Sequence, residues 1–133
     1  MYPEGSPILV IDSDGRRRRL SEQTLADEGF AVTAVPEGFS AIRAVEGQAF
    51  AVVIVAVNLP GTLDGPTTVR QLRDRQPWLK ALLIGELDGR VWRPERDCDD
   101  FIPAPFHQRD LLGCVFEVLQ RGTGDGQDRS RAG

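Results

Sequence analysis

Residues that could carry chemistry follow a short apolar run near the start of the chain. Asp12, Ser13 and Asp14 come directly after the run 8–11. In an open α/β sheet, functional groups lie just beyond the carboxyl ends of the central strands. We therefore take Asp12 and Asp14 as the carboxylates that are locally available for chemistry.

A longer apolar run, residues 50–57, should end at the same edge of such a sheet. Its eight apolar residues are unbroken and rich in β-branched side chains, which predicts a strand covered on both faces. The turn-forming sequence 58–61 then ends the strand. The strand directs Ala56, Val57 and Asn58 to the place where chemistry is expected. Ala56 has only a methyl group, so the strand offers no nucleophile there.

Four consecutive arginines open the helix that we predict over residues 16–28: Arg16, Arg17, Arg18 and Arg19. Cations at a helix N-terminus oppose the macrodipole, each by about 0.3–1 kcal/mol before salt screening. A sequence selected for stability alone would not place them there. The run is either a solvated basic turn or a contact site for an acidic protein partner. Nucleic acid is less favoured, because the chain is acidic overall and no aromatic residues are interleaved with the arginines.

Strand and helix patterns alternate along the chain. Short apolar runs bounded by turn residues predict strands over residues 8–11, 30–35, 50–57, 80–85 and 101–102. Apolar residues at helical spacing predict helices over residues 16–28, 38–46, 66–76 and 108–121. Leu20, Phe39 and Phe116 fall on the apolar faces of three of these helices. Because parallel strands need crossover helices, the alternation predicts an α/β fold with a doubly wound parallel sheet.

The segment 86–99 should form a further helix by this rhythm, but its sequence is poor for one. A glycine and a proline interrupt it, and it has no clear apolar stripe. Trp92 is its large apolar anchor, which either fills the space left by a shortened or irregular helix or belongs to an interface. Residues 122–133 form a polar, glycine-rich tail that we expect to be flexible, so the domain should span residues 7–121.

Composition excludes several classes of protein. The 133 residues suffice for one domain, and the formal net charge of −4 with a pI of about 5.0 does not favour a nucleic-acid surface. Cys98 and Cys114 are too few for a disulfide scaffold or a zinc site. No apolar run reaches membrane-spanning length and no signal peptide is visible, so we expect a cytoplasmic protein with no membrane contact.

The order and spacing of several short motifs resemble those of a response-regulator receiver domain over nearly all of residues 7–121. The matching segments are Ile8-Leu9-Val10-Ile11-Asp12, Gly29-Phe30-Ala31-Val32, Val57-Asn58-Leu59-Pro60-Gly61 with Asp64-Gly65, and Asp99-Asp100-Phe101 leading to Pro105-Phe106. The resemblance implies a flavodoxin-like five-stranded sheet in the order 2-1-3-4-5. It also implies phosphoryl transfer from a histidine kinase to an aspartate after the third strand. An acidic pair would hold magnesium, and a hydroxyl and a lysine would bind the phosphoryl oxygens.

The sequence departs from the receiver pattern at most of these chemical positions. Ala56 stands at the phosphoacceptor position, Gly85 at the hydroxyl position and Ala104 at the lysine position. The acidic pair is reduced to Asp12, because its neighbour is Ser13. These four losses are flanked by matching residues, so misalignment does not explain them.

Two further positions keep the receiver pattern. Asn58 matches, although the family's metal contact there is through the backbone carbonyl. Pro105 also matches, and the resemblance implies a cis peptide bond between Ala104 and Pro105. Asp14 could still lend an oxygen to the acidic site. We interpret the chain as a pseudo-receiver with a degenerate phosphorylation pocket, in which we expect no metal or other cofactor.

The leading hypothesis is a two-component signalling module that acts through protein–protein interaction, is not an enzyme and does not depend on phosphorylation. The resemblance implies that receivers dimerise or bind partners through the fourth helix, fifth strand and fifth helix. That face would include Trp92, Phe101, His107 and Arg109, although Phe101 could simply be packed and His107 could cap a helix. The arginines 16–19 would add a contact to a kinase's phosphotransfer domain. The partner would be a histidine kinase, an output domain or a second copy of the chain.

Two alternatives remain open. The chain could be an atypical receiver that is phosphorylated at another carboxylate, Asp12 or Asp14, or it could hold a small ligand in the vacated pocket. The first alternative lacks a lysine or hydroxyl partner for the phosphoryl group. The second lacks a glycine-rich phosphate loop.

Overall fold

The computed structural model describes residues 5–86 and 99–121. Strands and helices alternate in these ranges as β1 (Pro7–Ile11), α1 (Gly15–Asp27), β2 (Ala31–Val35), α2 (Gly38–Gly47), β3 (Val52–Ala56), α3 (Gly65–Arg75), β4 (Lys80–Gly85), β5 (Asp100–Pro103) and α5 (Gln108–Arg121). The five strands of the described part pair in parallel, in the order β2-β1-β3-β4-β5. The predicted flavodoxin-like α/β fold is therefore confirmed.

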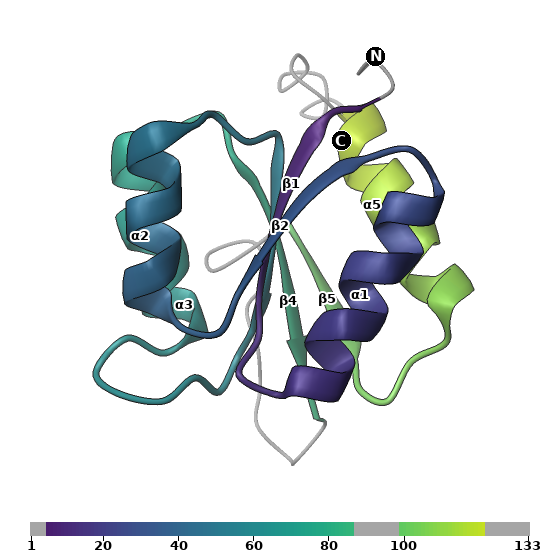
Figure 1. Ribbon diagram of the computed structural model, residues 1–133, viewed down its shortest axis with the longest axis horizontal. Coiled ribbons are helices and arrows are strands. Elements are labelled where there is room, and N and C mark those ends of the chain that lie inside the picture. The colour runs from purple at the N-terminus through teal and green to yellow at the C-terminus, as the bar shows by residue number, and fades with distance from the viewer. Residues whose placement is uncertain (1–4, 87–98, 122–133) are drawn as a thin grey trace, which may run out of the picture.

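Two layers of helices cover the sheet. α1 and α5 lie on one face and α2 and α3 on the other (Figure 1). Because side chains alternate along a strand, Ile8 and Val10 of β1 pack with α1 and α5, whereas Leu9 and Ile11 pack with α2 and α3. All five residues of β3 are at most 1% exposed. This central strand is buried on both faces, as its unbroken apolar run predicts.

Three apolar residues expected on inner helix faces are exposed instead. Leu20 of α1 is 39% exposed, Phe39 of α2 is 55% exposed and Phe116 of α5 is 42% exposed. On α1, the positions turned to the core are Ser21, Thr24 and Leu25. The prediction for Leu20 was wrong because its position lies at the border of the apolar face, beyond the area that the sheet covers.

A buried glutamine fixes the chain at the amino end of β3. The Gln76 side chain accepts a hydrogen bond from the Phe50 N–H at 3.0 Å and donates to the carbonyls of Val45 and Gln48 at 2.9 and 2.8 Å. The Trp78 indole N–H donates to the Phe50 carbonyl at 2.9 Å. One side chain at the end of α3 thus ties together the end of α2 and the start of β3.

A second polar cluster joins β4 and β5 at the same edge of the sheet. Asp99 Oδ2 accepts from the Ala81 N–H at 2.7 Å and from Arg73 Nη2 at 2.6 Å. Arg73 Nε also donates to the Leu79 carbonyl at 3.1 Å. This cluster anchors the start of β5 to both α3 and β4.

Some predictions fall outside the described residues. The segment 87–98, with Trp92 and the predicted shortened or irregular fourth helix, is one of these, and the tail 122–133 is another. The boundaries of the domain at 7 and 121 therefore stay a prediction. In residues 5–86 and 99–121, the helices are all too short or too polar to cross a membrane.

Candidate functional site

The carboxyl edge of the sheet brings the predicted site positions into one row. Asp12 follows β1, Ala56 ends β3, Gly85 ends β4 and Ala104 follows β5. The strands pair in parallel register up to this edge. The Ala104 N–H donates to the Gly85 carbonyl at 2.8 Å, which continues the ladder beyond β5. The receiver resemblance implied that these positions share one edge, and the strand pairing places them there.

The centre of this row holds small side chains packed against apolar neighbours. The methyl group of Ala56 is buried, and the residue is 1% exposed. A Cβ atom added to Gly85 would lie 3.0 Å from Cγ2 of Val57 and 3.5 Å from Cε1 of Phe101. A side chain at position 85 would therefore require Val57 to move by a few tenths of an ångström and would be in van der Waals contact with Phe101.

The loop after β3 is organised by backbone contacts and a cap. The Gly65 N–H donates to the Val57 carbonyl at 2.8 Å, and Asp64 caps α3 by accepting from the Thr67 N–H at 2.9 Å. A Cβ atom on Gly65 would lie 2.4 Å from the Ala56 carbonyl oxygen, so only glycine fits there. Asn58 is exposed in this loop.

Asp12 is a buried carboxylate that is fully engaged within its own segment. It is 1% exposed. Its Oδ2 accepts from Arg17 Nε at 2.5 Å, and its Oδ1 accepts from Arg17 Nη2 and from the Asp14 N–H, both at 3.0 Å. Arg18 Nη1 donates to the Asp12 carbonyl at 2.8 Å. Two of the four arginines therefore fold back onto this one aspartate.

The two residues after Asp12 are exposed, and one of them caps the next helix. Asp14 accepts hydrogen bonds from the N–H groups of Arg16 and Arg17 at 3.1 Å and so forms the N-cap of α1. The hydrogen bond from the Arg17 N–H is the largest cause that lowers the pKa of the Asp14 carboxyl below its usual value. Ser13 is exposed. Asp14 is thus a capping residue in this structure.

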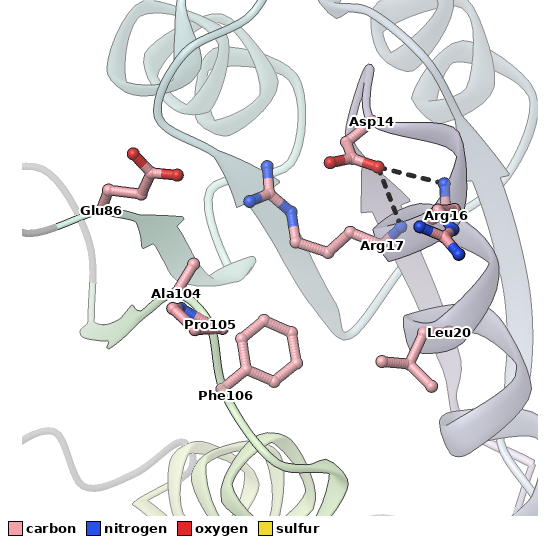
Figure 2. Close-up of a pocket in the computed structure, with 8 residues that line it drawn as sticks. All are labelled: Asp14, Arg16, Arg17, Leu20, Glu86, Ala104, Pro105 and Phe106. Atoms are coloured by element: carbon pink, nitrogen blue, oxygen red, sulfur yellow. Dashed lines mark hydrogen bonds between the residues drawn. The ribbon is translucent and has the colours of Figure 1, made fainter.

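A cavity of about 520 Å³ lies between α1 and the chain that follows β4 and β5. Figure 2 shows the Arg17 side chain leaving α1 and crossing this space towards Glu86, with the residues after β5 facing it. The cavity is lined by Asp14, Arg16, Arg17, Leu20, Glu86, Ala104, Pro105 and Phe106. The Ala104–Pro105 peptide bond is cis, as the receiver resemblance implies.

The acidic groups around Arg17 stabilise its positively charged form. The hydrogen bond to Asp12 is the largest cause that raises the pKa of the Arg17 guanidinium, and the charges of Asp14 and Glu86 act in the same direction. The Arg17 side chain is 24% exposed, whereas that of Asp12 is 2% exposed. The site therefore contains a permanent, partly buried cation.

The magnesium ion implied by the receiver resemblance does not fit the residues present. Magnesium needs oxygen ligands in near-octahedral geometry. Only Asp12 remains of the acidic pair, and Arg17 occupies both of its oxygens. Within the part of the chain that the structure describes, no three His, Cys, Asp or Glu side chains are grouped to hold a metal ion.

Of the residues predicted for an interaction face, Arg16 and Arg17 line the cavity, whereas Phe101, His107 and Arg109 do not. Phe101 is half-buried against the core beside β4. His107 is exposed just before α5. Its backbone N–H donates to Asp110 Oδ2 at 3.1 Å, a contact that caps the start of the helix. Arg109, Arg16 and Arg19 are exposed. Trp92 lies outside the described residues.

Sequence reasoning missed the internal role of Arg17 and Arg18. It offered a solvated turn or a partner contact for the whole run, but these two arginines bind Asp12. A usable signal was present: an acidic residue without its acidic neighbour, followed by arginines on the first turn of the next helix. Leu20, Glu86 and Phe106 were also not predicted to line a cavity at this edge.

Comparison with known proteins identifies relatives over most of the chain. A model of the response regulator receiver domain matches residues 8–116. Protein PetR of Rhodobacter capsulatus is 34% identical over 116 residues, which cover 86% of this chain and 48% of PetR. The transcriptional regulatory protein TcrA of Mycobacterium tuberculosis is 29% identical over 121 residues, which cover 89% of this chain and 47% of TcrA. The chain thus spans about half the length of these relatives.

Solved structures with the same fold include further receiver domains. The receiver domain of NtrX from Brucella abortus superposes with a TM-score of 0.80 at 27% identity, over 86% of this chain and 99% of that one. A response regulator receiver protein from Sinorhizobium medicae has a TM-score of 0.78 at 28% identity, over 88% and 96% of the two chains. Fold, motif order and sequence similarity agree, and this chain belongs to the response regulator receiver domain family.

Proposed function

We propose that the chain is a receiver-type signalling module that acts through protein–protein contacts and is not switched by phosphoryl transfer. One observation carries this proposal: the side chains at the ends of β3, β4 and β5 are Ala56, Gly85 and Ala104. Phosphoryl transfer at this edge would need an attacking carboxylate, a hydroxyl and a cation that stabilises the phosphoryl oxygens. Two methyl groups and a hydrogen supply none of these.

The packing around the row supports the same proposal. Val57 and Phe101 are the side chains nearest to a Cβ atom at position 85, so the immediate surroundings of this position are apolar. The two remaining carboxylates are engaged elsewhere: Asp12 is buried in the pair with Arg17, and Asp14 caps α1. Phosphorylation at either carboxylate would first have to break these contacts.

Output would then run through surfaces that no phosphoryl group controls. Around the start of α5, His107 and Arg109 are exposed, and on α1 Arg16, Arg19 and Leu20 are exposed. Basic groups beside an apolar side chain suit an acidic protein surface. The partner is a histidine kinase, an output domain or a second copy of the chain, and nucleic acid is disfavoured by the net charge of −4.

A second candidate function is binding of a small ligand, and the cavity beside Arg17 favours it. The cavity measures about 520 Å³ and combines guanidinium groups of Arg16 and Arg17 with apolar side chains of Leu20 and Phe106. Such a lining suits a ligand with an anionic group and an apolar body.

The proposal is tested by exposing the protein to acetyl phosphate, or to beryllofluoride, in the presence of magnesium. Intact mass spectrometry should detect no added phosphoryl group, and two-dimensional amide NMR should show no shifts at Asp12, Asn58 and Gly85. A receiver domain that carries the aspartate serves as the positive control for the reagents. Phosphoryl incorporation, or shifts clustered at these residues, would overturn the proposal. In the same NMR assay, shifts at Leu20 and Phe106 on adding small organic anions would identify the ligand-binding alternative.

A further inference from the structure

We propose that Arg17 is a built-in cation that takes the place of a divalent metal ion at the carboxyl edge. The inference rests on the proposed function in one respect: a pocket that binds no phosphoryl group has no use for an exchangeable metal. It goes further, because it assigns the positive charge that neutralises the Asp12 carboxylate to one side chain, Arg17. It also gives a reason for the two arginines of the run, Arg17 and Arg18, that contact Asp12.

The first step is the geometry at Asp12. The guanidinium of Arg17 donates to both carboxylate oxygens, through Nε at 2.5 Å and Nη2 at 3.0 Å. This two-point contact matches the planar fork of arginine to a carboxylate, which lysine cannot reproduce. The Asp14 N–H fills a further acceptor site on Oδ1. A metal ion that took both Asp12 oxygens as ligands would have to displace Arg17.

The second step is the balance of charge in the site. Three acidic groups face Arg17: Asp12, Asp14 and Glu86. Arg18 adds a second cation, which donates to the Asp12 carbonyl at 2.8 Å. At Asp12 itself, a divalent ion would be repelled at short range by the guanidinium groups of Arg17 and Arg18. The arginines therefore neutralise the carboxylate and also exclude a competing cation.

The third step is the placement of the arginine on α1. The guanidinium is covalently tethered five residues from its carboxylate, so it is present at a high and constant effective concentration. A free magnesium ion exchanges with solution, but Arg17 does not. Pairing with Asp12 also offsets the unfavourable position of Arg17 at a helix N-terminus. The state of this site should therefore not vary with the magnesium concentration.

The test compares metal binding with and without Arg17 after the acidic pair has been restored. Manganese serves as the probe, because its bound fraction is measured by electron paramagnetic resonance and by broadening of nearby amide signals. The wild-type chain and the Ser13→Asp variant should bind manganese weakly, since Arg17 still holds Asp12. The double variant Ser13→Asp/Arg17→Met should bind it at least ~10-fold more tightly. The matched control is Ser13→Asp/Arg19→Met, which removes an exposed arginine from the same run and should behave like Ser13→Asp.

Several outcomes would overturn the inference. Tight manganese binding by the wild-type chain is one of them, and equal affinity of Ser13→Asp with and without Arg17 is another. Should the Arg17→Met change prevent folding, Ser13→Asp/Arg17→Lys keeps a positive charge but cannot contact both oxygens, and its affinity should lie between the other two. An affinity of this lysine variant no higher than that of Ser13→Asp also contradicts the inference.

These readouts are separate from those of the proposed function. Every variant keeps Ala56, and the measured quantity is the affinity for manganese. Phosphoryl incorporation by the wild-type chain would overturn the proposed function. Manganese binding by the wild-type chain without incorporation would overturn only the role of Arg17.

Discussion

The two edges of the sheet use their polar side chains in opposite ways. At the amino edge, Gln76 and Asp99 bind groups far away in the sequence, including Phe50 and Arg73, each 26 positions away. At the carboxyl edge, Asp12 is bound by Arg17, only five positions away, beside a cavity of about 520 Å³. Polar contacts between distant segments thus fix the tertiary arrangement at the amino edge. At the carboxyl edge, the charge of Asp12 is neutralised by a residue close in sequence, and a cavity remains beside the pair.

The largest effect that tests this comparison should come from Gln76→Ala. The change leaves the Phe50 N–H and the Val45 carbonyl without their partner in a buried place, and the Gln48 carbonyl without its partner in a partly buried one. At roughly 1–3 kcal/mol for each buried group left unpaired, and with some relaxation, we expect a loss of about 3–5 kcal/mol in the free energy of unfolding. Urea denaturation followed by circular dichroism measures it.

The matched control is Gln71→Ala on the same helix. Among the residues that the structure describes, the Gln71 side chain bonds only to Arg75, at 3.3 Å and near the surface, so the expected change is about 0.5 kcal/mol or less. If both substitutions cost the same, the amino edge has no special role and the comparison of the two edges fails.

A smaller effect is expected at the carboxyl edge from Gly85→Thr. The new Cβ would lie 3.0 Å from Cγ2 of Val57, so the neighbour must move, and overpacking of this kind costs about 1–3 kcal/mol. Adding Val57→Ala should recover part of the lost stability in thermal denaturation, because it removes the clashing methyl groups. Failure of this second change to help would show that the space at position 85 is not set by Val57.

Replacing a glycine on α5 should change the free energy of unfolding in the opposite direction. A Cβ atom at Gly113 would meet no atom within 4 Å. Gly113→Ala should therefore raise the free energy of unfolding by about 0.5–1 kcal/mol through helix propensity alone. This variant separates the steric effect at Gly85 from the general effect of replacing a glycine.

The smallest effect concerns Cys114, which lies on α5 and reports on the fold independently of both edges. Burial is the largest cause that raises the pKa of the Cys114 thiol from its ordinary value of 9.0 to about 11. At pH 8 the thiolate fraction should be roughly 100-fold below that of an ordinary thiol, so alkylation by iodoacetamide should be slow by a similar factor. Peptide mass spectrometry measures this rate at Cys114 itself.

The direction of the pH dependence follows from the same shift. The folded chain favours the neutral thiol, so this small contribution to stability is present below about pH 9 and is lost as the pH rises towards 11. Carboxyl-edge variants that keep the fold should keep the slow alkylation, whereas Gln76→Ala should accelerate it by opening the chain more often. If Gly85→Thr accelerated the alkylation of Cys114 as much as Gln76→Ala does, the two edges would not differ in their effect on stability.

The sequence allowed the order of the described elements to be predicted, because strand and helix periodicity is a local property. It also predicted which residues meet at the carboxyl edge, since parallel strands end together. It did not predict the burial of Ser21 in place of Leu20, because helical spacing defines a face but not its borders. The roles of Gln76 and Arg17 were missed for a similar reason: their partners depend on how far each side chain reaches in three dimensions.

The contact between Val57 and the backbone at Gly85 has a consequence for how this chain can evolve. A mutation that introduced a hydroxyl at position 85 would meet Cγ2 of Val57 at once, and a lysine at position 104 or an aspartate at position 56 would not relieve that contact. An acidic residue at position 13 would still find Asp12 held by Arg17. A phosphoryl-binding pocket at this edge would therefore require several substitutions together, including changes at the neighbours Val57 and Arg17.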